Sequence, residues 1–99
     1  MAEDPLKVYE NLDPEMRKQV ENMRAFAFRE GPLPVKTKVL IAMALDASHG
    51  AVQGVRALAN LAMKAGATKE EIAEALRVAF YVCGAGSVYT AAAGLKELF

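Results

Sequence analysis

The sequence predicts an all-α protein of about five to six helices, a class supported by three kinds of observation. Apolar residues recur at intervals of three and four in several segments, which is the period of an amphipathic helix. Helix-start signals stand at Asp13-Pro14 and at Thr68–Glu71. No stretch bounded by turn residues alternates apolar and polar residues as a half-buried strand would. We expect one domain spanning residues 1–99.

The first expected elements are a short helix within residues 5–12 and a longer helix from Pro14 to about Arg29. Asp13 suits the capping position before this helix, and proline suits the first helical position. The longer helix carries an amphipathic stripe formed by Met16, Val20, Met23 and Ala27. Glycine and two prolines in residues 31–34 then predict a turn, because they disfavour continuation of the helix.

The third and fourth helices are expected from about residue 34 or 35 to 48 and from about 51 to 65. Residues 39–45 are apolar on every face, so we expect the third helix to be central. The break between the two helices falls near Ser48–Gly50, and Gly66 suits the position just past a helix end. The methionines within these helices, and those at positions 16 and 23, are expected to fill the core.

The fifth helix is expected from Lys69 to about Cys83 and the last from Val88 to Leu98. Thr68 and Glu71 have the spacing of a capping box at the start of the fifth helix. Residues 84–86 interrupt the helical pattern, and Ser87 is the expected cap of the last helix.

The composition indicates self-association. The chain has 99 residues, of which 54% are apolar and only 24% charged, although a small monomer needs a mostly polar surface. We therefore expect apolar faces that other subunits cover. The alternative is an alanine-rich helical core, because alanine raises the apolar count without requiring a partner.

The charge and cysteine content of the chain indicate which kinds of binding partner and which cellular compartment to expect. The formal net charge is zero, without a basic cluster, so binding to nucleic acid or to an anionic membrane is not expected. The apolar runs are too short to span a bilayer, and the acidic start lacks the features of a leader peptide. A single cysteine cannot form an internal disulfide. We expect a cytoplasmic protein.

Three consecutive segments resemble the carboxymuconolactone decarboxylase and alkylhydroperoxidase D-like family. LPVKTKVLIAMALDASHGAVQGVRALANLAMKAG (33–66) resembles its core helix pair. KAGATKEEIAEALRVAFYVCGAG (64–86) resembles its glycine turn, acidic helix start and glycine-rich helix end, and SVYTAAAGLKEL (87–98) resembles the terminal helix of short members. The resemblance implies an alkylhydroperoxidase D-like helical bundle that assembles as a dimer and, in many members, as a hexamer formed by three dimers.

The residues of the family's redox chemistry are replaced in this sequence. Redox members carry a glutamate, a CxxC pair and a histidine, at positions that match Val39, Ala51, Gly54 and Leu58 here. A dithiol peroxidase needs a thiolate and a base that activates it, and these four side chains supply neither. Dithiol peroxidase activity is therefore not expected. The family also includes gamma-carboxymuconolactone decarboxylases, which do not use the CxxC pair.

Asp46 and His49 are candidate catalytic residues. They stand three positions apart, so they share a face if both are helical. An aspartate can orient an imidazole and increase its basicity, which suits a general acid or base. In the alternative interpretation, His49 donates to carbonyls at a helix end and has no catalytic role.

Cys83 is a third candidate catalytic residue, because the resemblance places its turn beside the active-site helices. A base such as His49 could activate the thiol. The alternative is a buried cysteine that serves as a small apolar residue.

Gly84, Gly86, Ser87 and Tyr89 are candidate residues for binding a substrate. Backbone N–H groups after glycines at a helix start can receive a carboxylate, and Tyr89 could add a hydroxyl. The alternatives are a tight turn between helices and a tyrosine at a subunit interface. No metal or cofactor is expected, because no second histidine accompanies His49.

These residues support two main functional hypotheses. One is a cofactor-free lyase that acts on a small carboxylate or lactone through His49. The other is a non-catalytic oligomeric binding or structural protein, in which the four replaced positions are packed shut. A third hypothesis, thiol chemistry at Cys83 alone, requires an exposed thiol.

Overall fold

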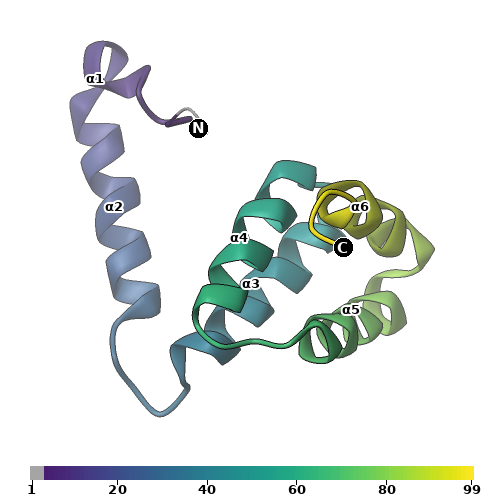
Figure 1. Cartoon of the computed structure of the whole chain (residues 1–99). Coiled ribbons are helices and arrows are strands. Elements are labelled where there is room, and N and C mark those ends of the chain that lie inside the picture. The colour runs from purple at the N-terminus through teal and green to yellow at the C-terminus, as the bar shows by residue number, and fades with distance from the viewer. Residues whose placement is uncertain (1–3) are drawn as a thin grey trace. The chain divides into compact units, whose positions relative to one another are not determined.

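The computed structural model describes residues 4–99, and these form six helices and no strand (Figure 1). The helices are α1 (Tyr9–Leu12), α2 (Pro14–Phe28), α3 (Val35–Ser48), α4 (Val52–Lys64), α5 (Lys69–Cys83) and α6 (Ala85–Leu95). This confirms the prediction of an all-α protein with five to six helices. The acidic start at residues 1–3, used above to predict the absence of a leader peptide, lies outside the described residues.

Contacts divide the chain into two units, one ending at Gly31 and the other comprising Pro32–Phe99. The first unit contains α1 packed on α2, and the second contains the other four helices. In the second unit α3 contacts α4, α5 and α6, so it is central to that unit as predicted (Figure 1). None of the helices described between residues 4 and 99 is long and apolar enough to cross a bilayer.

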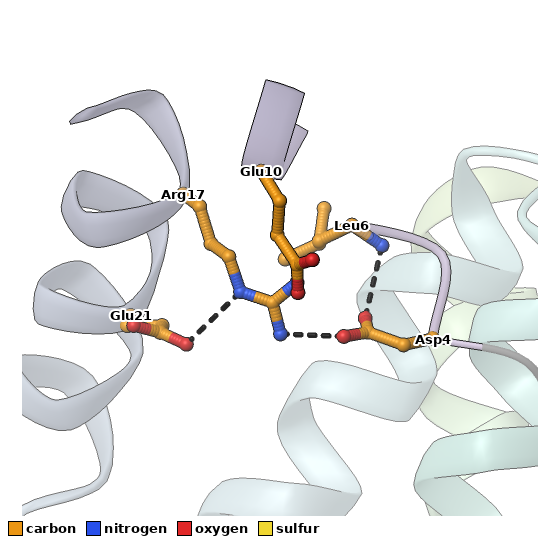
Figure 2. Close-up of polar contacts among 5 residues, drawn as sticks. All are labelled: Asp4, Leu6, Glu10, Arg17 and Glu21. Atoms are coloured by element: carbon orange, nitrogen blue, oxygen red, sulfur yellow. Dashed lines mark hydrogen bonds and ion pairs between the residues drawn. The ribbon is translucent and has the colours of Figure 1, made fainter. Parts of the chain in front are cut away.

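Arg17 of α2 organises the polar side of the first unit. Its guanidinium lies between the carboxylates of Asp4 and Glu21 and 3.8 Å from that of Glu10 (Figure 2). The hydrogen bond from Arg17 lowers the pKa of Asp4, and that from the Leu6 N–H adds to this effect. The arginine therefore ties the residues before α1, and α1 itself, to the side of α2.

The start of α2 forms as the sequence predicts. The Asp13 carboxylate accepts a hydrogen bond of 3.1 Å from the Met16 N–H, and Pro14 occupies the first helical position. The expectation that Met16 and Met23 fill a core is wrong, because α2 contains no buried residue. The hydrophobic pattern predicts an apolar face on the helix but does not specify what covers it.

The core of the second unit lies where α3, α4, α5 and α6 meet. Its largest fully buried side chains are those of Met43, Ile72, Val39 and Val55. Met43 thus fills the core as predicted. Although residues 39–45 of α3 are apolar on every face, Ile41 and Leu45 on the side away from this core remain exposed.

Two local motifs join α4 to α5. At the end of α4, the Gly66 N–H donates to Met63 and the Ala67 N–H to Ala62, while Gly66 has a φ of 98°. These paired bonds satisfy carbonyls that the helix end leaves free. At the start of α5, Thr68 and Glu71 form the predicted capping box, with reciprocal bonds of 3.1 and 2.9 Å.

Glu71 also connects the starts of α3 and α5. Its second carboxylate oxygen lies 3.0 Å from the Lys36 ammonium. The hydrogen bond from the Thr68 N–H, and then that from Lys36, hold the pKa of Glu71 below its ordinary value of 4.5. Because the folded state lowers this pKa, the charge stabilises the fold above about pH 4.5, and this stabilisation is lost as the pH falls through the lowered pKa.

We expect Glu71→Gln to have a lower free energy of unfolding than the native protein at neutral pH. In acid, where Glu71 itself is protonated, we expect the two proteins to be equally stable. Glutamine keeps the shape and the capping acceptor but removes the charge that faces Lys36. Urea unfolding of both proteins at pH 3–7 measures the difference in stability. The control is Glu70→Gln, which removes a charge from the same helical turn without changing either contact. A difference that persisted below the pKa of Glu71 would contradict this explanation.

The junction of α5 and α6 differs from the prediction. Gly84 ends one helix and caps the next, so α6 begins at Ala85 and not at Val88. Ser87 is therefore not the cap; it lies in the first turn, where its hydroxyl donates to the Gly84 carbonyl at 2.7 Å. The reason is the backbone of Gly84, whose φ of 86° and ψ of −176° are accessible essentially to glycine alone. This conformation lets α6 begin directly where α5 ends.

We expect Gly84→Ala to destabilise the protein by about 1–3 kcal/mol, the cost of placing a side chain in this backbone conformation. Gly86→Ala is the matched control, because a Cβ there meets no atom within 4 Å and position 86 is helical. That variant should gain about 0.5–1 kcal/mol. Thermal unfolding followed by circular dichroism compares the two, and equal effects would show that the junction does not need glycine.

Candidate functional site

The four positions that the resemblance pairs with the family's redox residues are buried or half-buried. Val39 is fully buried in α3, and Leu58 of α4 packs against the core. Gly54 lies against the Asp46 side chain, and a Cβ at position 54 would stand 2.1 Å from the nearer carboxylate oxygen. A cysteine at this position would therefore require Asp46 to move. Neither sulfur nor an ionisable group is provided by any of the four residues.

His49 ends α3 and contacts its last turn. Ring atom Nδ1 lies 2.8 Å from the Leu45 carbonyl oxygen. A carbonyl only accepts hydrogen bonds, so Nδ1 carries the proton and Nε2 of a neutral ring holds the lone pair. This is the helix-end arrangement of the alternative interpretation. The side chain is exposed.

Asp46 and His49 are not paired. The half-buried Asp46 side chain lies against Gly54 of α4, whereas the His49 ring contacts the last turn of α3. Within residues 4–99 no hydrogen bond or ion pair joins these two side chains, nor does one join His49 to Cys83. The three candidate catalytic residues therefore form no relay in this chain.

Cys83 lies in the wall of a groove between α3 and α5, which we call the α3–α5 groove. Its volume is about 330 Å³. It is lined by Thr37, Leu40, Ile41, Ala44, Leu45, Ser48, Ala75, Val78, Ala79, Val82 and Cys83. The thiol is exposed, so the interpretation of Cys83 as a buried apolar residue is wrong. The reason is its position as the last residue of α5, where no helix of the second unit covers it.

The wall of the α3–α5 groove is almost wholly apolar. Apart from Cys83, only Thr37 and Ser48 bring polar side-chain atoms, and the Ser48 hydroxyl already donates to the Leu45 carbonyl at 2.6 Å. Val78 and Val82 are exposed over 62% and 70% of their surface. Sequence reasoning missed this groove. Its signal was a row of uncharged residues on α3, Thr37, Ile41, Ala44 and Ser48, opposite the row that faces the core.

The candidate binding residues around the α5–α6 junction do not converge on one site. Ser87 is buried, and its hydroxyl is engaged by Gly84. Gly86 is exposed in the first turn of α6. Tyr89 is exposed and lines a separate shallow groove between α5 and α6, together with Phe80. Within residues 4–99, no three histidine, cysteine or acidic side chains gather as a metal site would require.

Comparison with protein-family models identifies the family of this chain. The model of the carboxymuconolactone decarboxylase family matches residues 14–97, from the first residue of α2 to beyond the end of α6. The chain belongs to this family. The matched region includes the four positions Val39, Ala51, Gly54 and Leu58 as well as every residue that lines the α3–α5 groove. No curated protein and no solved structure gave a significant match.

Proposed function

We propose that this chain is a non-catalytic, self-associating member of the carboxymuconolactone decarboxylase family, with binding rather than turnover as its role. The observation that carries the proposal is the wall of the α3–α5 groove, which contains no charged residue and neither acid nor base of the candidate pair. Self-association as a dimer, or as a hexamer of three dimers, is part of this proposal.

The chemistry of a lyase explains why this wall favours binding. Breaking or forming a bond next to a carbonyl requires a group that moves a proton, placed within hydrogen-bond reach of the substrate. Ligand sites of enzymes therefore combine apolar walls with a few convergent polar groups. In the α3–α5 groove one of the two hydroxyls is already engaged by a helix carbonyl, and no cation is available in the wall to hold a carboxylate.

The exposed apolar surface supports self-association. Large apolar side chains from two helices, including Ile41, Leu45, Val78 and Val82, stand together along the groove and are all exposed. Monomeric proteins seldom expose contiguous apolar patches of more than a few hundred Å². Covering such a surface gains about 25 cal/mol per Å², so a second subunit would stabilise it considerably.

Sedimentation and an activity assay together test the proposal. We expect mass to rise with protein concentration, and Ile41→Glu to abolish association while leaving helix content unchanged, because Ile41 faces away from the core. We also expect no turnover of a carboxymuconolactone. The matched control is Leu61→Glu, which places the same charge at an apolar position of equal exposure, 47%, outside the groove wall. A protein that is monomeric at every concentration, or one that turns over the lactone, would overturn the proposal.

A cofactor-free lyase centred on His49 is the second candidate. The contact between Nδ1 and Leu45 favours it, because it fixes the ring and leaves Nε2 as a proton acceptor at the exposed end of α3. A small carboxylate or lactone would be the substrate. Loss of turnover in His49→Gln, with the fold retained, would support this function. Equal turnover in the two proteins would exclude His49 as its base.

A further inference from the structure

Helix α2 carries an apolar surface that the first unit leaves exposed. This α2 stripe consists of Met16, Val20, Met23, Phe26 and Ala27. Met23 and Phe26 are exposed over 65% and 68% of their surface. An isolated helix of 15 residues is only marginally stable in water, because most helical stability in proteins comes from packing an apolar face. The stripe therefore needs a surface to cover it.

The α2 stripe and the α3–α5 groove match in length and character. The stripe extends from Met16 to Ala27, and the α3 side of the groove from Thr37 to Ser48, so each spans three helical turns, or about 16 Å. Neither surface contains a charged residue. An amphipathic helix that lays its apolar face in an apolar groove is a common mode of recognition.

Charged residues lie beside both surfaces. Glu74 of α5 lies beside the groove, in a neighbouring hollow that shares Leu40 and Val78 with it. Within residues 4–99, Glu74 forms no ion pair. Arg24 follows Met23 on α2 and so flanks the stripe. Arg77 lines the same hollow, so this rim carries charges of both signs. A helix docked in the groove could place Arg24 beside Glu74, an attraction that a helix with acidic flanks would lack.

We propose that the α2 stripe of one copy occupies the α3–α5 groove of a second copy. This inference rests on the self-association proposed above and names its two surfaces. Each chain carries one stripe and one groove, so a reciprocal exchange about a two-fold axis covers both stripes and both grooves in a closed dimer. An unrelated partner helix would leave the α2 stripe itself uncovered.

The native Cys83 allows a direct test, because it lies in the groove and is the only cysteine of the chain. A tagged chain carrying Met23→Cys and Cys83→Ser is mixed with untagged wild-type protein and oxidised mildly. We expect a disulfide between the tagged and the untagged chain, identified by mass spectrometry as joining position 23 to position 83. The matched control carries Ala25→Cys and Cys83→Ser; position 25 lies about 200° around α2 from position 23 and should give no such product.

The outcomes separate this inference from the proposed function. Sedimentation that shows a dimer without the 23–83 disulfide overturns the inference, while the proposed self-association stands. Sedimentation that shows only a monomer overturns both. A further variant carries Met23→Cys and keeps the native Cys83. A disulfide between positions 23 and 83 of the same chain would also overturn the inference. Met23 is largely exposed, so its replacement leaves the fold intact, and circular dichroism checks this for every variant. Adding Ile41→Glu to the untagged chain should eliminate the disulfide.

Discussion

Val39→Glu is expected to destabilise the second unit of this protein severely. Val39 has 0% of its surface exposed in α3, and the resemblance described in the sequence analysis pairs it with the glutamate of redox members. A carboxylate buried there without a partner costs about 3–5 kcal/mol, a large part of the 5–15 kcal/mol that stabilises a typical domain. Urea unfolding measures the loss.

The control for this variant is Val35→Glu, the same change one helical turn earlier in α3. Val35 is 49% exposed at the start of the helix, where a negative charge suits the helix dipole. We expect that variant to remain within about 0.5 kcal/mol of the native protein. If Val39→Glu proved as stable as Val35→Glu, the family's glutamate position would be open to water and not buried as described.

Gly94→Val is expected to give the second large loss of stability. A Cβ at Gly94 of α6 would lie 2.7 Å from the Val52 backbone oxygen and 3.0 Å from the Val55 Cβ, both at the start of α4. Backbone cannot withdraw as a flexible side chain can, so α6 would have to separate from α4. Overpacking typically costs 1–3 kcal/mol, and we expect about 3 kcal/mol here.

Gly86→Val adds the same side chain to the same helix where a Cβ meets nothing within 4 Å. We expect its free energy of unfolding to stay within about 0.5 kcal/mol of the native value, since valine and glycine differ little in helix propensity. Thermal unfolding of the two variants compares them directly. Similar losses at both positions would show that the close approach of α4 and α6 is not what requires glycine at position 94.

Sequence reasoning succeeded where the determining interactions are local. The caps at Asp13 and Thr68 are each set by residues three positions apart, and both are present. Ser87 misled the prediction of α6 because a serine before an apolar run indicates a cap, whereas the backbone of Gly84 decides where the helix begins. Family, helix number and the central position of α3 were all predictable.

The candidate site was less predictable, because it depends on which faces of different helices meet. The spacing of Asp46 and His49 suggested a pair, but Asp46 lies against Gly54, a contact between helices that no local pattern contains. The apolar stretch 39–45 of α3 predicted a central helix, yet the second unit has too few helices to cover the side that carries Ile41. Whether such a face is covered depends on partners, which spacing along one chain does not specify.

Gly84 has a mechanical consequence for the two grooves. Because α5 ends and α6 begins at this one residue, there is no slack between the helices. A shift of α5 along its axis must therefore be transmitted to α6, and with it to the shallow groove that Tyr89 lines. A partner that contacts α5 in the α3–α5 groove therefore bears on the helix whose end also positions the start of α6.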